Sequence, residues 1–152
     1  MSKTLVLGLG NPLRGDDGVG PAVIAALQAH PLPSEVTLLD GGAPGLETAL
    51  LFEGYRRAVI VDAAAMGEAP GTWRRFTPAE AQLLLREASM RGTLHDAGLA
   101  EALALAEALG LLPPELVFYG VQPAEVGWAP GMSAPVATAV PAVCAAILHE
   151  LT

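Results

Sequence analysis

The sequence lacks most features of a secreted, disulfide-bonded or nucleic-acid-binding protein. It has one cysteine, Cys144, in 152 residues, which excludes an internal disulfide and favours a reducing compartment. Lysine and arginine together number 8 against 16 acidic residues, so the net charge is −8. Because nucleic-acid binding normally needs a basic face, no nucleic-acid partner is predicted. Cys144 lies in an alanine-rich apolar helical pattern and is predicted to be a buried, unreactive thiol.

Long hydrophobic runs are also missing. The best candidate, residues 134–148, looks too short to span a membrane and contains two prolines. The N-terminus lacks the basic region and cleavage site of a signal peptide. A cytoplasmic protein without a membrane segment is the simplest interpretation. With 52% hydrophobic residues, the chain can form one domain, residues 1–152, with a substantial core.

Short apolar runs alternate with segments of helical length. This pattern predicts an α/β protein with an open, mostly parallel sheet covered by helices on both faces, which makes three layers. Only about six residues join the third and fourth strands, too few for a helical crossover, so these two should pair antiparallel. The predicted strands are 4–10, 35–40, 57–64, 71–76 and 115–122; the predicted helices are 18–30, 45–54, 78–90, 94–109 and 134–151, the last kinked near Pro141.

The loop "LGLGNPLRGDDGVG" (7–20) follows the first strand, where a phosphate site could lie. The dinucleotide fingerprint requires a third glycine at the position that Leu13 occupies. Asp16 and Asp17 would also repel a pyrophosphate from the helix N-terminus. One aspartate is enough to cap the following helix. The other would project into the crevice at the carboxyl ends of the strands, where open α/β sheets bind ligands.

Two further polar residues are expected near this crevice. Asp62 ends the apolar third strand, where a carboxylate is costly to desolvate without compensation; it either caps a turn, pairs with an arginine or belongs to a site. His95 lies in "GTLHDAGL", where Thr93 and Asp96 have the spacing of a capping box. A histidine in the first helical turn is favoured in its neutral, metal-binding form.

The other candidates for chemistry are weaker. His30 closes a helix and His149 lies near the chain end, so both are predicted to be structural or solvated. No Gly-x-Ser-x-Gly or His-Glu-x-x-His motif is present, and Ser133 is predicted to cap the last helix. One imidazole and two carboxylates would suit a divalent transition metal with open positions, although structural roles for these residues stay open.

The ordered motifs of the chain resemble the hydrogenase maturation endopeptidases, which trim the large subunit of nickel–iron hydrogenases. The resemblance covers nearly the whole chain. Its motifs are "VLGLGNPLRGDDGVG", "LLDGGAPGLE", "AVIVDAA", "LHDAGLAEAL", "VFYGVQP" and "GMSAPVATAV".

The resemblance implies a twisted five-stranded sheet with one antiparallel strand. It also implies that Asp17, Asp62 and His95 contact a metal, with Asp16 as the alternative to Asp17 and the likelier helix cap. Asp17 is shorter than the glutamate that some members carry. In "DGG", Asp40, Gly41 and Gly42 would lie where the substrate backbone approaches.

The implied activity is removal of the C-terminal extension from the large-subunit precursor after nickel insertion. Nickel would be carried by the substrate, and zinc or cadmium could replace it in vitro. The alternatives are a nucleotide- or metal-binding module on the same scaffold, a free-standing zinc hydrolase, and a chaperone for the precursor. The client hydrogenase, the cleaved bond and the oligomeric state are not predicted.

Overall fold

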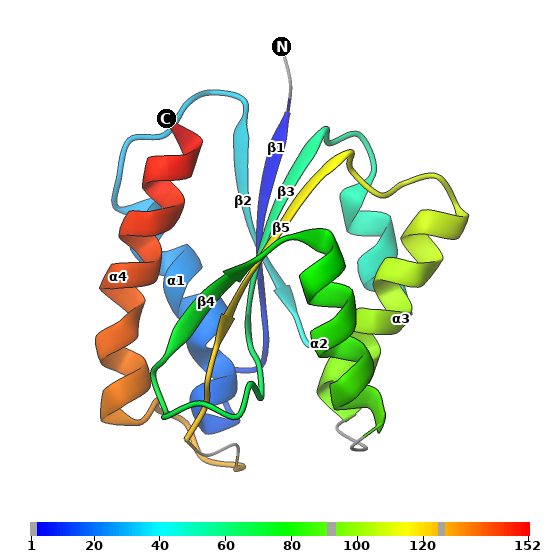
Figure 1. The fold of residues 1–152 in the computed structure, drawn as a ribbon. Coiled ribbons are helices and arrows are strands. Elements are labelled where there is room, and N and C mark those ends of the chain that lie inside the picture. Colours follow the sequence, from blue (N-terminus) through cyan, green and yellow to red (C-terminus); the bar gives the residue numbers. More distant parts are fainter. Residues whose placement is uncertain (1–2, 91–93, 125–126) are drawn as a thin grey trace.

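A computed structural model describes residues 3–90, 94–124 and 127–152, except for the side chains of residues 85, 88–90 and 94–97. These described residues form five strands, four α-helices and two short 3-10 helices (η) (Figure 1). The strands are β1 (Thr4–Leu9), β2 (Val36–Gly42), β3 (Arg57–Ala63), β4 (Trp73–Phe76) and β5 (Glu115–Val121). The helices are η1 (Gly15–Gly18), α1 (Val19–Gln28), η2 (Leu46–Phe52), α2 (Pro78–Met90), α3 (Leu94–Ala108) and α4 (Ala134–Leu151).

The strands form one sheet in the order β2-β1-β3-β5-β4. All neighbours are parallel except β4 and β5, which are antiparallel. The predicted fold class is therefore confirmed, and β4 lies at one edge of the sheet. The predicted pairing of the third and fourth strands is wrong, because β5 lies between them.

The burial of the strands explains this order. β3 is buried along almost its whole length, and the largely buried β5 fits beside it better than β4, whose two arginines are exposed. Charged side chains are typical of a sheet edge. The chain after β3 wraps around the end of β5: Ala64 N–H donates to Val121, and Gln122 N–H donates to Thr72.

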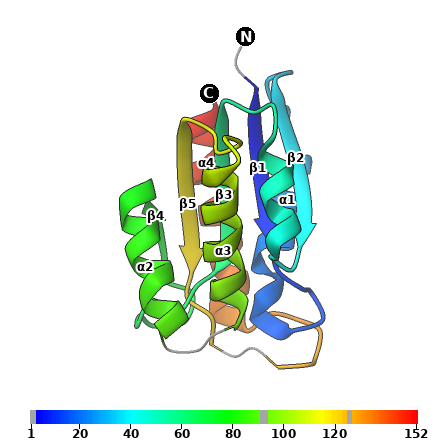
Figure 2. The ribbon, with the colours of Figure 1, turned by 90° about the vertical axis from the view of Figure 1, so that its right-hand side faces the viewer.

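Helices cover both faces of the sheet and divide the core in two. α1 and α4 lie on one face, and η2, α2 and α3 lie on the other (Figures 1 and 2). Side chains of β1 and β3 alternate between the two cores, as expected for strands buried on both faces. Val59 and Val61 join the α1–α4 side, whereas Ala58 and Ile60 join the α2–α3 side.

Two glycines bring α1 unusually close to the sheet. A Cβ atom on Gly20 would lie 2.2 Å from the Leu9 carbonyl oxygen and 2.8 Å from that of Val61. A Cβ atom on Gly8 would lie 2.6 Å from the Gly20 carbonyl oxygen. Larger residues would push the helix away, so this pair sets η1 and the start of α1 directly over the ends of β1 and β3.

The last helix has the bounds that the sequence predicted, residues 134–151. α4 spans 18 residues and continues through Pro141, with a mean hydropathy of 1.5. By length and composition it could cross a membrane, so the expectation that this segment is too short was wrong. Its buried side chains, including Val136, Val143 and Ile147, pack in the α1–α4 core, as those of a core helix do.

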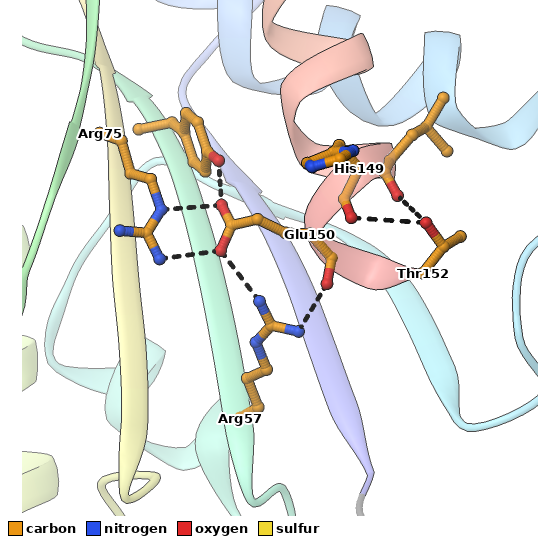
Figure 3. A network of polar contacts seen from close by, with 7 residues as sticks. Arg57, Arg75, His149, Glu150 and Thr152 are labelled. Atoms are coloured by element: carbon orange, nitrogen blue, oxygen red, sulfur yellow. Dashed lines mark hydrogen bonds and ion pairs between the residues drawn. The ribbon is translucent and has the colours of Figure 1, made fainter.

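The far end of α4 is fixed by an ionic network at the amino-terminal edge of the sheet. Glu150 accepts hydrogen bonds from Arg57 of β3 and from both Nε and Nη2 of Arg75 in β4, at 2.9 to 3.0 Å (Figure 3). Tyr119 of β5 donates its hydroxyl to the same carboxylate. Arg57 also donates to the Glu150 carbonyl. These bonds connect the last turn of α4 to three strands.

Candidate functional site at the carboxyl edge of the sheet

Three buried aspartates lie at the carboxyl edge of the parallel strands. Asp16 and Asp17 belong to η1, directly after β1, and Asp62 is the penultimate residue of β3. Their relative exposures are only 1%, 2% and 1%. η1 contacts β3, so the first loop and the end of β3 meet as the sequence predicted. Buried carboxylates at this edge need compensating donors or a cation.

Asp16 binds the segment between β5 and α4. Its Oδ2 accepts from the backbone N–H of Ala124 and from the hydroxyl of Ser133, each at 2.8 Å. Its Oδ1 accepts from the Ser133 backbone N–H at 2.6 Å. Because η1 precedes α1, the N-cap of α1 is Gly18. The prediction that Asp16 caps α1 is therefore wrong; it holds together two loops that are far apart in sequence.

Asp17 faces the first loop itself. Its Oδ2 accepts from the Asn11 backbone N–H at 2.8 Å, while the Asn11 side chain accepts from the Leu13 N–H. This closes the turn between β1 and η1 around the Asp17 carboxylate. This hydrogen bond fixes the orientation of the Asp17 carboxylate within the first loop.

Asp62 points to the α2–α3 side of the sheet. Alternate residues of a strand share a face, and Ile60, two residues earlier, packs in that core. α3 covers the same face, and its buried Leu99 belongs to the same core. Asp62 therefore lies in the layer of the helix that carries His95.

His95 is the second residue of α3, and its side chain lies outside the described part of the chain, as do Thr93 and the predicted capping box. The helix itself is placed by Gly98, where a Cβ atom would lie 2.7 Å from the Pro44 carbonyl oxygen. The first turns of α3 therefore lie against the loop that follows β2. Among the described residues, no three His, Cys, Asp or Glu side chains form a metal-binding group.

The "DGG" segment ends β2 beside the first loop. Asp40 is exposed and accepts from the Gly42 N–H at 3.1 Å, and the Gly42 carbonyl accepts from Gly10 N–H at 2.9 Å. The space beside Gly41 is filled by Leu7 and Leu9, whereas a Cβ atom on Gly42 would meet nothing within 4 Å. Of the two glycines, only Gly42 has open space beside it.

Two residues position this edge through hydrogen bonds that the sequence did not indicate. Ser133 is at the N-cap of α4 as predicted, but its hydroxyl donates to Asp16 and makes no capping bond. Gln122 follows β5 and accepts through Oε1 from the N–H groups of Met66 and Glu68, at 2.6 and 3.3 Å. Both bonds join segments distant in sequence, so no local spacing indicates them.

The remaining candidates behave as predicted. His30 and His149 are exposed near helix ends. Cys144 is buried among apolar side chains, and this burial raises the pKa of its thiol. A thiol with a raised pKa is a poor nucleophile.

The fold and the site together define an α/β protein with buried carboxylates at the carboxyl edge of its sheet. Residues 21–150 match the model of the hydrogenase maturation protease family, and the chain belongs to this family. It is 42% identical over 82% of its length to the hydrogenase expression/formation protein HupD of Thiocapsa roseopersicina. It is 32% identical over 95% of its length to the hydrogenase 2 maturation protease of Escherichia coli, of which it covers 90%.

Solved structures of the family have the same fold. The hydrogenase maturating endopeptidase HybD from E. coli superimposes with a TM-score of 0.88 and 29% identity, over 98% of this chain and 91% of that one. By contrast, the chain spans 56% of the length of the HupD protein that it matches.

Proposed function

We propose that this chain is an endopeptidase that removes the C-terminal extension of the nickel–iron hydrogenase large-subunit precursor after nickel insertion. Residues 1–152 act as one domain, and the reaction takes place in the cytoplasm. Asp17, Asp62 and His95 recognise nickel already bound in the precursor, which is therefore part of the substrate. The observation that carries the proposal is the pair of buried carboxylates, Asp17 and Asp62, at one edge of the sheet.

The roles of the two loop aspartates favour Asp17 as the ligand. Asp16 accepts three hydrogen bonds from Ala124 and Ser133, so it serves to hold the β5–α4 segment. Asp17 accepts from the Asn11 N–H within its own loop, so this bond does not tie it to the β5–α4 segment. A site with carboxylate and imidazole ligands and open positions suits a borderline divalent ion such as nickel. Zinc or cadmium would fit the same donors.

Nickel in the precursor would polarise the scissile carbonyl or a water molecule, as a Lewis acid does. Asp17, Asp62 and His95 would orient the loaded precursor, and Asp40 with Gly41 and Gly42 would flank its extended backbone. Precursor without nickel would lack the group that these residues recognise. Cleavage would thus be limited to loaded precursor.

The test uses purified protein with nickel-loaded and nickel-free precursor, and the products are weighed by mass spectrometry. We expect release of the extension from the loaded form only. Equal cleavage of both forms would overturn the recognition of nickel. Precursor binding without any peptide release would instead support a chaperone.

Variants of the ligands test the site itself. Asp17→Asn, which keeps an oxygen acceptor for the Asn11 N–H, and His95→Ala should lose cleavage while thermal unfolding stays close to that of the parent protein. His149→Ala, at an exposed histidine in the last turn of α4, is the matched control and should retain full activity. If His95→Ala cleaves as well as His149→Ala, the histidine has no role in the reaction.

The alternative functions give different results in the same assays. A free-standing zinc hydrolase would copurify with stoichiometric zinc and cleave short peptides without nickel. A nucleotide-binding module would be stabilised against heat by nucleotides. We expect stabilisation by Ni²⁺, Zn²⁺ or Cd²⁺ and none by nucleotides.

A further inference from the structure

Two large apolar side chains are exposed beside the buried aspartates. Leu13, in the first loop, is 61% exposed, and Trp128, in the β5–α4 segment, is 78% exposed. Figures 1 and 2 show these two segments together at the carboxyl edge of the sheet. Leu13 lies only four residues before Asp17, so this apolar surface adjoins the candidate site.

Arg14 connects the two loops at this surface. Its guanidinium carbon lies 4.7 Å from the ring centroid of Trp128, which is a cation–π contact. Its Nε is buried, and no acceptor within the described residues binds it. A buried donor without an acceptor is destabilising, so this nitrogen gains from any oxygen that reaches it.

The backbone holds this arrangement firmly. Gly15 N–H donates to the Ala129 carbonyl at 2.8 Å, and Asp16 binds Ala124 and Ser133 on either side of Trp128. The same two loops and the start of α1 line a pocket of about 290 Å³ whose walls include Pro12, Pro21 and Met132. Exposed apolar side chains on a fixed backbone are typical of a binding surface.

We propose that Leu13, Arg14 and Trp128 form the surface that selects the client segment of the precursor. The inference rests on the proposed function for the identity of the client. An apolar side chain of an extended precursor segment packs on Trp128 and Leu13. An oxygen of the same segment accepts from Arg14, and the Trp128 ring moves to let it reach the guanidinium.

Position and charge favour the precursor as the occupant. The surface is continuous with the loop of Asp16 and Asp17, so a segment bound on it lies directly beside that loop. Arg14 is a cation in a chain of net charge −8, and it offers a hydrogen-bond donor where the occupant brings an acceptor. These three residues therefore determine which precursor is accepted, whereas the aspartates determine whether it carries metal.

A spectroscopic experiment tests contact directly. The Asp62→Asn protein, labelled with 5-fluorotryptophan, is titrated with nickel-loaded precursor and followed by ¹⁹F NMR. The chain has 2 tryptophans, and Trp73, the half-buried first residue of β4, serves as the internal control, assigned with Trp73→Phe. We expect the Trp128 resonance to shift and that of Trp73 to keep its position. Saturating precursor that leaves Trp128 unshifted would overturn the inference.

A kinetic experiment tests selection. Trp128→Ala should raise KM for the precursor about tenfold with kcat unchanged, because it removes binding energy made equally in the ground and transition states. Arg14→Gln should raise KM about fivefold, and Trp128→Phe, which keeps an aromatic face, should stay near the parent value. Leu109→Ala, at an equally exposed leucine beyond the end of α3, is the control.

The outcomes separate the two proposals. If the parent protein leaves the precursor intact while Trp128 still shifts, the proposed function fails and the docking surface stands. If the parent protein cleaves the precursor and Trp128→Ala shows an unchanged KM, the docking surface fails and the function stands.

Discussion

Acidic side chains lie at both edges of the sheet, buried at the carboxyl edge and partly buried at the amino-terminal edge, and they are held in different ways. At the carboxyl edge, the described donors to Asp16 and Asp17 are backbone N–H groups and a serine hydroxyl. At the amino-terminal edge, Glu150 accepts from the guanidinium groups of Arg57 and Arg75. Cationic donors neutralise a carboxylate, whereas neutral donors only orient it. The guanidinium partners of Glu150 make a structural joint, whereas the described bonds of Asp16 and Asp17 fix the positions of their carboxylates.

The pKa values of Glu150 and Tyr119 agree with a structural role for the network at the amino-terminal edge. Burial raises the pKa of Glu150, but hydrogen bonds from Arg75 and Tyr119 and the two arginine charges outweigh it and hold the pKa below its usual value. Burial and the bond to Glu150 raise the pKa of Tyr119, so the phenol stays protonated as a donor. The joint therefore keeps one charge state across the neutral range.

The largest effect is expected when charge is removed at the carboxyl edge. Asp62→Asn keeps the shape of the side chain and removes its charge, so we expect cleavage of nickel-loaded precursor to fall by about 10²–10³-fold, as for loss of one preorganised electrostatic group. The free energy of unfolding should stay within about 1 kcal/mol of the parent value. Glu53→Gln, at an exposed site, is the control. Full activity in Asp62→Asn would contradict a role for this charge.

The next largest effect concerns the hydrogen bonds by which Asp16 connects η1 to the segment between β5 and α4. Asp16→Ala leaves three donors of Ala124 and Ser133 without their acceptor, and each unsatisfied buried donor costs about 1–3 kcal/mol. We expect the free energy of unfolding in urea to fall by about 3 kcal/mol. Ser133→Ala, which removes only the hydroxyl donor, should cost about 1 kcal/mol. An Asp16→Ala protein as stable as the parent would show that these bonds contribute nothing.

Much of the fold could be predicted because its signals are local. Apolar runs and helical spacing indicated the five strands and the four α-helices to within a few residues, whereas η1 was not predicted. The partner of β4 could not be predicted, because it depends on which strand fills the place beside β3. The strand beside β3 is the one whose side chains are largely buried, and this depends on the packing of the whole sheet.

The location of the candidate site could be predicted from the sequence, but the hydrogen-bond partners of its residues could not. The rule that ligands bind beyond the carboxyl ends of the strands located Asp17 and Asp62 correctly at one edge. The rule did not show that Asp16 binds the β5–α4 segment and does not cap a helix. The hydrogen-bond partners of Asp16 lie more than a hundred residues away along the chain, so no local pattern indicates them. The Arg14–Trp128 contact was missed for the same reason.

A moderate effect is expected at the opposite joint, and it depends on pH. Glu150→Gln should lower the free energy of unfolding by about 2 kcal/mol at pH 7, since hydrogen bonds to charged groups contribute about 1.5–3 kcal/mol. A lowered folded pKa means that this stability is present above the ordinary pKa of 4.5 and is lost as pH falls through the folded value. Urea unfolding of both proteins from pH 7 to pH 3 should show the difference shrinking below about pH 4.5. Cleavage should remain at the parent rate, in contrast to Asp62→Asn.

The smallest effect is expected for the more exposed arginine of this joint. The Arg75 side chain is 48% exposed, against 25% for Arg57, although both bind Glu150. Solvent screens an exposed pair, so Arg75→Gln should lower the free energy of unfolding by about 0.5 kcal/mol. Arg57→Gln should cost more, because Arg57 also donates to the Glu150 carbonyl. Urea unfolding in low and high salt gives the comparison: salt should reduce the Arg75 effect more than the Arg57 effect. If Arg75→Gln costs as much as Glu150→Gln, the joint depends on its edge-strand arginine, and exposure does not decide how much each arginine contributes.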